Sequence, residues 1–498
     1  MKQAVLNRHG RCAAVFALTA AVWFAASRAG VAQTLLLQGG RIIPVAGPEI
    51  KKGDILIEDG RIMKIIPRRP GRGGAKTDEV PFDAKVIDVS GKVLFPGMID
   101  VHTTGGLDVP NESPPVTPFL NVYDAIDPSQ LFFEDALRDG VTSIHVIPGN
   151  NCVIAGLSRV VHPIGMTPDE MTTAPDVAIK LSLSPKRGFD RMLQMATFRE
   201  TFAKLDEDMA KLAERRYEET LREEKRDLDV APEEAQERGR KLIRDEDVPE
   251  KDRNLLRLTQ GKLRAFVYCG KAMDVPAAVA LSKAHGFFDQ SVFVLGGECY
   301  KAIDALKKAG RPVVLDADLI YREIDPITGE EKETFVPSLV DQAGLKFALQ
   351  RKRGASLGER YLWYQAARCV REGISRPKAL KAITVWPAEM LGLGDRLGSI
   401  EPDKDANILV LSGDPLDAQT WVERVFVQGA EVYDRDEDIR LKRLLAPPEA
   451  ELGPSATAGN ATTGSVDAGR ASGKNRPGKD GQDRPRRPRR DRPRRERP

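Results

Sequence analysis

The sequence predicts an α/β fold, a (β/α)8 TIM barrel with a small β-sandwich formed from both ends of the folded region. Two observations predict it. Between residues 96 and 395, short apolar runs alternate with helical stretches, which is the pattern of parallel β/α units. On either side, residues 34–95 and 396–436 alternate apolar residues with Gly-Arg and Asp-Gly turns, as β-hairpins do.

The length of the chain bounds its domain organisation, and its charge limits the classes of partner that it can bind. A chain of 498 residues can hold a barrel and a satellite domain. Its net charge of +3 is unevenly distributed: residues 1–32 carry four basic and no acidic side chains, and residues 447–498 carry thirteen basic and seven acidic ones. The body between them therefore has a net charge of −7. This balance argues against specific binding of nucleic acid.

Residues 1–32 are interpreted as a signal peptide. Lys2, Arg8 and Arg11 give a positive start, residues 12–26 are an apolar stretch too short to span a membrane comfortably, and residues 30–32 are small enough for cleavage. An uncleaved anchor is the less favoured alternative. Export predicts a periplasmic or extracellular location. The four cysteines of the mature chain are too few for a disulfide scaffold, and their pairing is left open.

Seven apolar runs in the middle of the chain are candidate barrel strands. An eighth is needed to close a barrel, and we place it within 105–140, although prolines there favour irregular loops. The seven candidates are residues 98–101, 143–147, 177–181, 263–268, 292–295, 313–315 and 345–349.

Two charged segments lie outside this alternation. Residues 199–256 are rich in Glu, Lys and Arg, and Phe202, Leu205 and Met209 have helical spacing. A solvated helix covering the barrel is favoured over a partner-binding arm. The Pro- and Arg-rich tail, residues 447–498, is predicted to be disordered. It could contact a polyanion or have no specific partner.

The stretch FPGMIDVHTTGG, residues 95–106, is the strongest motif. It delivers His102 at the carboxyl end of a strand, where barrel enzymes place functional residues. With DGVTSIHVIPGNN at 139–151 and the long ALKAITVWPAEMLGLGDRLGSIEPDKDANILVLSGDPL at 379–416, the chain resembles the amidohydrolase superfamily. The resemblance is to the imidazolonepropionase-like metal-dependent hydrolases and covers residues 34–436. It implies the barrel and the composite sandwich, and hydrolysis of carbon–nitrogen bonds other than peptide bonds. The family uses zinc or another divalent metal to activate water.

The resemblance also implies where metal ligands stand, and this chain departs from the pattern. On the first strand His102 is kept, but Thr104 stands where the motif has a second His. Lys180 matches the family's bridging lysine on the fourth strand, although an ordinary lysine is the favoured interpretation. His102 and Lys180 are therefore the candidate metal ligands, and no firmly bound cofactor is expected.

Further along the barrel the expected ligands are missing. The family's H-x-H-R place on the fifth strand holds Tyr268, Cys269, Gly270 and Lys271, and a glycine pair replaces a His on the sixth. The expected Asp of the eighth strand falls near Arg351 and Lys352, which would place positive charge where the cation sits. Cys269 should point away from the face that Tyr268 occupies.

The sequence leaves the catalytic residues unknown. The candidate pocket residues are Thr104, His145, Tyr268 and Lys271. No nucleophilic-serine, P-loop or dinucleotide motif occurs in a supporting context. The first hypothesis is a carbon–nitrogen hydrolase with a degenerate metal site. The alternative is an inactive small-molecule-binding or scaffold protein, paired with an active homologue. An oligomer is compatible with both.

Overall fold

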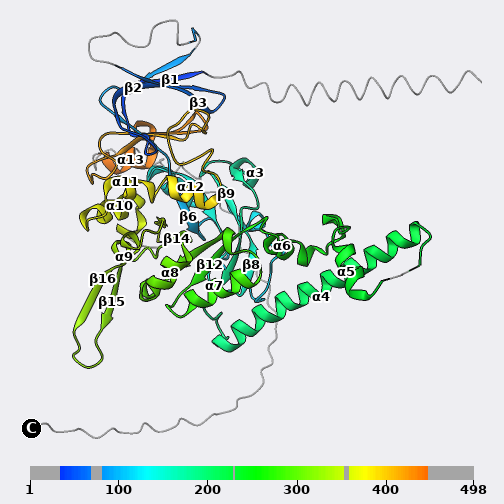
Figure 1. Ribbon diagram of the computed structural model, residues 1–498. Coiled ribbons are helices and arrows are strands. Elements are labelled where there is room, and N and C mark those ends of the chain that lie inside the picture. The colour runs from blue at the N-terminus through cyan, green and yellow to red at the C-terminus, as the bar shows by residue number, and fades with distance from the viewer. Residues whose placement is uncertain (1–33, 69–80, 83, 228–229, 353–357, 447–498) are drawn as a thin grey trace, which may run out of the picture. The chain divides into compact units, whose positions relative to one another are not determined.

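The computed structural model describes residues 34–68, 81–82, 84–227, 230–352 and 358–446 and shows a mixed α/β protein (Figure 1). The expected signal peptide and Pro/Arg-rich tail lie outside the described residues. Among the helices of the described ranges, none combines the length and the apolar character needed to cross a membrane.

The two hairpin-rich ends of the folded region form one sheet. The strand order is β20-β19-β18-β5-β1-β2-β3, and β4 pairs with β1. The strands β5 and β18 join the two ends, with Phe95 opposite Leu409 in antiparallel register. Figure 1 shows the strands from the two ends side by side. The strands are β1 (Leu35–Ile42), β2 (Ile50–Glu58), β3 (Arg61–Pro67), β4 (Lys85–Asp88), β5 (Val93–Pro96), β18 (Ile408–Leu411), β19 (Val422–Val427) and β20 (Ala430–Asp434).

We expect Leu409→Ala to destabilise the protein by about 2–5 kcal/mol, because Leu409 is fully buried where the two ends of the chain meet. Met63, on β3 of the same sheet, is 49% exposed. Met63→Ala should therefore change stability by less than about 0.5 kcal/mol. Urea unfolding of both variants measures this. Equal effects at the two positions would contradict a shared core at β5 and β18.

The middle of the chain forms two further sheets with parallel strands. One has the order β10-β9-β7-β6, with β10 at Thr172–Ala174, and the other β17-β14-β13-β12-β11-β8. Each of the seven apolar runs found in the sequence overlaps one of the parallel strands. These are β6 (Met98–Thr103), β7 (Val141–Val146), β11 (Ala178–Ser182), β12 (Arg264–Cys269), β13 (Ser291–Leu295), β14 (Val313–Val314) and β17 (Phe347–Ala348).

The predicted eighth strand within 105–140 is wrong. That segment holds η2 (Val122–Ala125) and α2 (Leu131–Arg138). Two short strands lie between β7 and β11 instead, β8 (Ile154–Leu157) and β9 (Arg159–Val161). β8 pairs antiparallel with β11, and β9 pairs antiparallel with β7. Ser158 separates them and bonds through its backbone N–H to the Ala178 carbonyl at 2.8 Å. Ser158 divides residues 154–161 into two short apolar runs. Each run is too short to give a clear strand signal in the sequence.

The other ends of the two parallel sheets approach each other through a loop. Leu349 donates a backbone hydrogen bond to the Ala382 carbonyl at 3.1 Å, and Ile99 donates one to the Ile383 carbonyl at 3.0 Å. Strand-to-strand pairing does not run continuously around both sheets in the described ranges.

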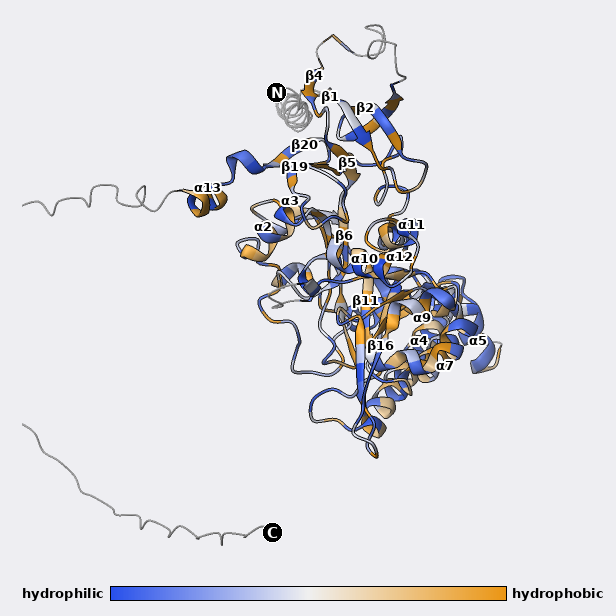
Figure 2. Ribbon diagram, turned by 90° about the vertical axis from the view of Figure 1, so that its left-hand side faces the viewer, coloured by the Kyte–Doolittle hydropathy of each residue, from blue (hydrophilic) through white to orange (hydrophobic). Residues whose placement is uncertain are grey.

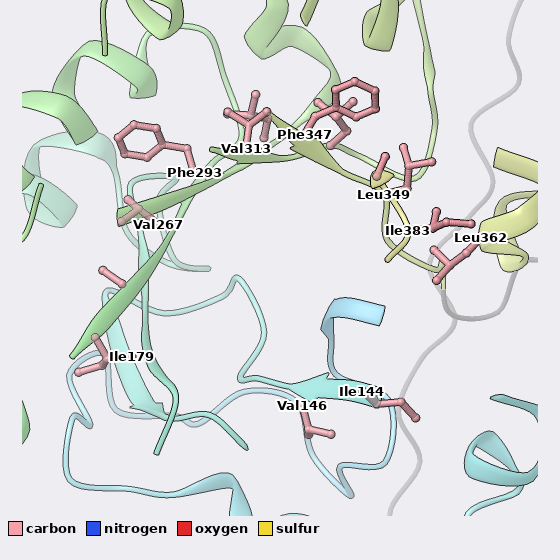
Figure 3. Close-up of a cluster of buried hydrophobic side chains, with 14 of the residues drawn as sticks. Ile144, Val146, Ile179, Val267, Phe293, Val313, Phe347, Leu349, Leu362 and Ile383 are labelled. Carbon is pink, nitrogen blue, oxygen red and sulfur yellow. The ribbon is translucent and has the colours of Figure 1, made fainter. Parts of the chain in front are cut away.

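Helices cover the outer faces of these sheets. Alternate strand residues such as Ile179, Val267 and Phe293 are buried against them, and Figure 3 shows these side chains on the outer side of the curved strands. The opposite faces of the same strands form a second buried cluster that includes Phe266 and Val294. The helices are α7 (Asp274–Ala284), α8 (Ile303–Ala309), α9 (Val336–Gln342), α10 (Leu362–Arg371), α11 (Arg376–Lys381) and α12 (Val385–Leu391).

The charged excursion contains the long helix α4 (Arg191–Glu223), followed by α5 (Pro232–Arg240) and α6 (Glu250–Thr259). Phe202 of α4 is buried in the main core, whereas Tyr217 near its end packs with α5. Figure 1 shows α4 and α5 side by side, and in Figure 2 this region mixes hydrophilic and hydrophobic colour. One part of this excursion therefore packs against the main core, and the other part packs with α5.

Candidate functional site

Strand alternation puts a lysine inside the curved sheets. On β11, Ile179 and Leu181 belong to the outer core beneath the helices. Successive side chains of a strand point to opposite faces, so Lys180 points inward. Its side chain is fully buried, with 0% of its surface exposed. Lysine is almost never buried without a partner, so its surroundings require an explanation.

The partner of Lys180 is His102, at the end of β6. Lys180 Nζ lies 2.7 Å from His102 Nε2, and His102 Nδ1 lies 2.8 Å from Gln350 Oε1. The Gln350 amide donates through Nε2 to the Leu315 carbonyl at 2.8 Å, which turns its oxygen toward His102. His102 therefore carries its proton on Nδ1, and its Nε2 accepts a hydrogen bond from Lys180.

Burial determines the protonation states of Lys180 and His102. It lowers the pKa of Lys180 to about 7, because the charged ammonium loses its solvation. Burial, reinforced by the charge of Lys180, also lowers the pKa of His102 well below its usual value. His102 is thus neutral at physiological pH, and a substantial fraction of Lys180 is a neutral amine.

His145 and Phe266 support the pair. His145 donates through Nδ1 to the Val101 carbonyl at 2.7 Å, and its Nε2 lies 2.7 Å from the Ser158 hydroxyl. The Phe266 ring packs against His145, with 4.7 Å between ring centroids, and stacks with His102 at 6.4 Å. His145 is fully buried, and burial lowers its pKa to about 3.

The structure brings only some of the predicted site residues together. The Tyr268 ring lies 5.6 Å from Lys180 Nζ and is half-buried, and Thr104 follows β6 directly and is also half-buried. Lys271 is exposed, and its backbone N–H binds Asp274. Cys269 lies in the outer core, on the face opposite Tyr268, as strand alternation predicted.

Arg351 and Lys352 do not place their charges beside His102, contrary to the expectation from the sequence. Arg351 instead sends its guanidinium 2.7 Å from Asp139, and Lys352 places its ammonium 2.5 Å from Asp318. Arg351 follows the inward-facing Gln350 and points the other way, and half-buried Asp139 provides its counter-charge. The residue of this strand end that does reach His102 is Gln350.

The donor set does not fit the family's metal. The lone pair of His102 Nε2, which would face a metal ion, faces Lys180 instead. A zinc site needs three or four good nitrogen, sulfur or carboxylate donors. Across the described ranges, no cluster of three His, Cys, Asp or Glu side chains could hold a metal ion. His102 and Lys180 therefore form a hydrogen-bonded pair rather than part of a ligand set.

Sequence reasoning missed Gln350 and Phe266. The signal for Gln350 was alternation: Phe347 and Leu349 face the outer core, so the polar residue after them faces inward. Phe266 alternates in the same way with Val267. Neither signal reveals the partner, because Gln350 and His102 are 248 residues apart.

Comparisons with known proteins agree with this architecture. A model described as "Amidohydrolase family" matches residues 353–433. Amidohydrolase tasK of Hapsidospora irregularis is 26% identical over 407 residues, which are 77% of this chain and 40% of tasK. The N-substituted formamide deformylase of Arthrobacter pascens is 40% identical over 70 residues, 13% of each protein. The chain thus spans less than half the length of these curated relatives.

A solved structure covers more of the fold. The crystal structure of an amidohydrolase from Thermotoga maritima MSB8 superposes with a TM-score of 0.65 at 26% sequence identity. It covers 80% of this chain and 100% of the Thermotoga chain. The family match, tasK and the Thermotoga structure together define the class: the chain belongs to the amidohydrolase superfamily.

Proposed function

We propose that this chain hydrolyses a carbon–nitrogen bond other than a peptide bond, and that it does so without the family's metal ion. The observation that carries the proposal is the 2.7 Å contact between Lys180 Nζ on β11 and His102 Nε2 near the end of β6. A buried amine whose pKa lies near 7 is suited to general-base catalysis at physiological pH.

In the proposed reaction, neutral Lys180 accepts a proton from water. The water oxygen forms a bond to the substrate carbonyl carbon. The carbon–nitrogen bond then breaks, and Lys180 returns the proton to the leaving nitrogen. His102 accepts a hydrogen bond from Lys180 and thereby directs the amine lone pair, while Gln350 fixes the His102 tautomer.

The proposed site lies in a complete β/α barrel. Support comes from the two junctions between the parallel sheets, at Ser158 and at Ile383, where backbone hydrogen bonds link neighbouring strands. In such a barrel, the carboxyl ends of the strands form the active-site face. The positive start and apolar stretch of residues 1–32 support the further proposal that the protein is exported.

A second candidate is ligand binding without hydrolysis, in partnership with an active homologue. The complete burial of Lys180 favours it, because a catalytic base must reach its water. The length of tasK, of which this chain spans 40%, also leaves room for additional domains in a related protein.

One assay separates the two candidates. The full chain is incubated with cyclic amides, amidines and N-acyl amines in the presence of EDTA, and products are identified by mass spectrometry. Hydrolysis in EDTA supports the first proposal. Binding of these compounds without turnover supports the second. Turnover that appears only when zinc is added contradicts a metal-free mechanism.

A further inference from the structure

A hollow lies between the two segments that follow β6 and β7. Residues 107–125 form one wall, and residues 148–156 form the other. Backbone hydrogen bonds join the two walls: Ile154 N–H donates to the Pro115 carbonyl at 3.1 Å, and Thr117 N–H donates to the Ile154 carbonyl at 2.8 Å. The empty volume is about 490 Å³, open solvent included. The hollow is therefore formed in advance of any ligand, and its size suits a small molecule.

The walls of the hollow are mainly apolar and uncharged. Leu107, Val122 and Ala155 are buried residues of the lining. Cys152 also lines the hollow, and burial raises the pKa of its thiol to about 11, so the thiol is uncharged at physiological pH. Of the described residues that line the hollow, only Glu112 carries a charge, and it is exposed to solvent. Burying an ionised group without a counter-charge is costly, so these walls favour an uncharged ligand.

Asn111 gives the lining an available hydrogen-bond donor. Its Oδ1 accepts a hydrogen bond from Asn151 N–H at 2.9 Å, which orients the amide. The amide lies against Gly149, where a Cβ would come within 2.6 Å of Oδ1 and 2.7 Å of Nδ2, so this placement requires glycine. Across the described ranges, no protein acceptor binds Asn111 Nδ2. The other amide of the lining, on Asn121, already donates to Asp176 at 2.7 Å. Asn111 Nδ2 can therefore bind an acceptor atom of a ligand.

We infer that this hollow binds a small, uncharged carbonyl compound, whose apolar body contacts the walls and whose carbonyl oxygen accepts a hydrogen bond from Asn111 Nδ2. A carbonyl oxygen is an acceptor without a charge, which matches both the amide donor and the neutral lining. The site is separate from the one proposed for hydrolysis, because Lys180, His102 and Gln350 are not among the lining residues. The inference therefore does not rest on the proposed function.

The test uses three ligands of similar size and shape, none of which has a carbon–nitrogen bond to hydrolyse. Acetophenone carries a phenyl ring and a neutral carbonyl group, ethylbenzene lacks the carbonyl oxygen, and benzoate has a charged oxygen in place of the methyl group. Ligand-observed NMR titration of the full chain compares their affinities. Acetophenone should bind about three- to tenfold more tightly than ethylbenzene, the usual effect of one neutral hydrogen bond. Benzoate should bind at least about tenfold more weakly than acetophenone, because its charge has no partner in the hollow.

Two variants locate the binding. Ala125 is a half-buried residue of the lining, so Ala125→Phe places a ring in the hollow and should abolish the binding of acetophenone. The matched control is Ala277→Phe, at a half-buried alanine of α7 outside the hollow, which should leave binding unchanged. Asn111→Asp keeps the acceptor for Asn151 N–H but removes the amide donor. In this variant acetophenone should lose its preference over ethylbenzene.

The absence of saturable acetophenone binding below about 10 mM, the weak limit for so small a ligand, overturns the inference. So does unchanged binding in Ala125→Phe, which would place the ligand elsewhere on the protein. Equal or tighter binding of benzoate contradicts an uncharged ligand, and an unchanged preference for acetophenone in Asn111→Asp contradicts the hydrogen bond from Asn111. Circular dichroism checks that the variants are folded. If Ala125→Phe fails to fold, the three ligands and Asn111→Asp still decide the outcome.

Discussion

Replacing Lys180 with Met should lower the rate of carbon–nitrogen hydrolysis by about 10²–10⁴-fold, the usual contribution of a general base. Met has a similar volume but cannot accept a proton or bind His102. The loss should appear in kcat. Lys180 deprotonates the attacking water in the transition state and does not contribute to binding of the substrate in the ground state. Initial rates with the best substrate of the EDTA assay measure it.

The control is Lys262→Met, which removes an exposed lysine just before β12, at the strand end opposite the site. This variant should keep wild-type activity. A Lys180→Met protein that is folded and retains more than about a tenth of the wild-type rate contradicts the assigned base role.

The same Lys180→Met substitution should stabilise the protein at neutral and lower pH. Below pH 7 the wild-type lysine is charged in both the folded and the unfolded chain, so the folded protein bears the full cost of the buried charge. Between pH 7 and about 10, the unfolded chain keeps a proton that the folded protein has released, because burial lowers the pKa of Lys180 from 10.5 to about 7. Wild-type stability therefore rises with pH in this window.

The advantage of Lys180→Met should shrink across that window by on the order of 4 kcal/mol. Urea unfolding of both proteins at pH 6, 8 and 10 measures the difference in free energy of unfolding. Lys262→Met provides the baseline, because its difference from wild type should stay nearly constant. A difference for Lys180→Met that is also constant with pH would mean that the lysine is solvated in the folded protein.

The parallel strands could be predicted from sequence because each is a short apolar run with a strict inside–outside alternation, as in residues 177–181. The strands that lie between β7 and β11 could not be predicted in this way. Ser158 interrupts its run, and the two pieces pair antiparallel with their neighbours. The joining of β5 to β18 followed from the similar hairpin rhythm of two segments about 300 residues apart.

The candidate site was only partly predictable. His102 could be identified because it stands at the end of an apolar strand, and Lys180 because it matches the family's bridging lysine. Their contact could not be, since 78 residues separate them and only the packed sheets bring them together. The direction of Arg351 was likewise hidden, because it depends on its ion pair with Asp139, 212 residues away in the sequence. Local patterns identify which face a residue occupies, but tertiary packing decides which partner it meets.

The most direct test of a metal-free site is the metal content of the purified protein. The full chain is prepared in zinc-containing medium without chelator, dialysed mildly and analysed by inductively coupled plasma mass spectrometry. Because His102 Nε2 is bound to Lys180 and too few other donors are near, we expect well under about 0.1 equivalent of zinc and no loss of stability in EDTA. About one equivalent of zinc, lost in His102→Ala together with hydrolytic activity, would contradict the account.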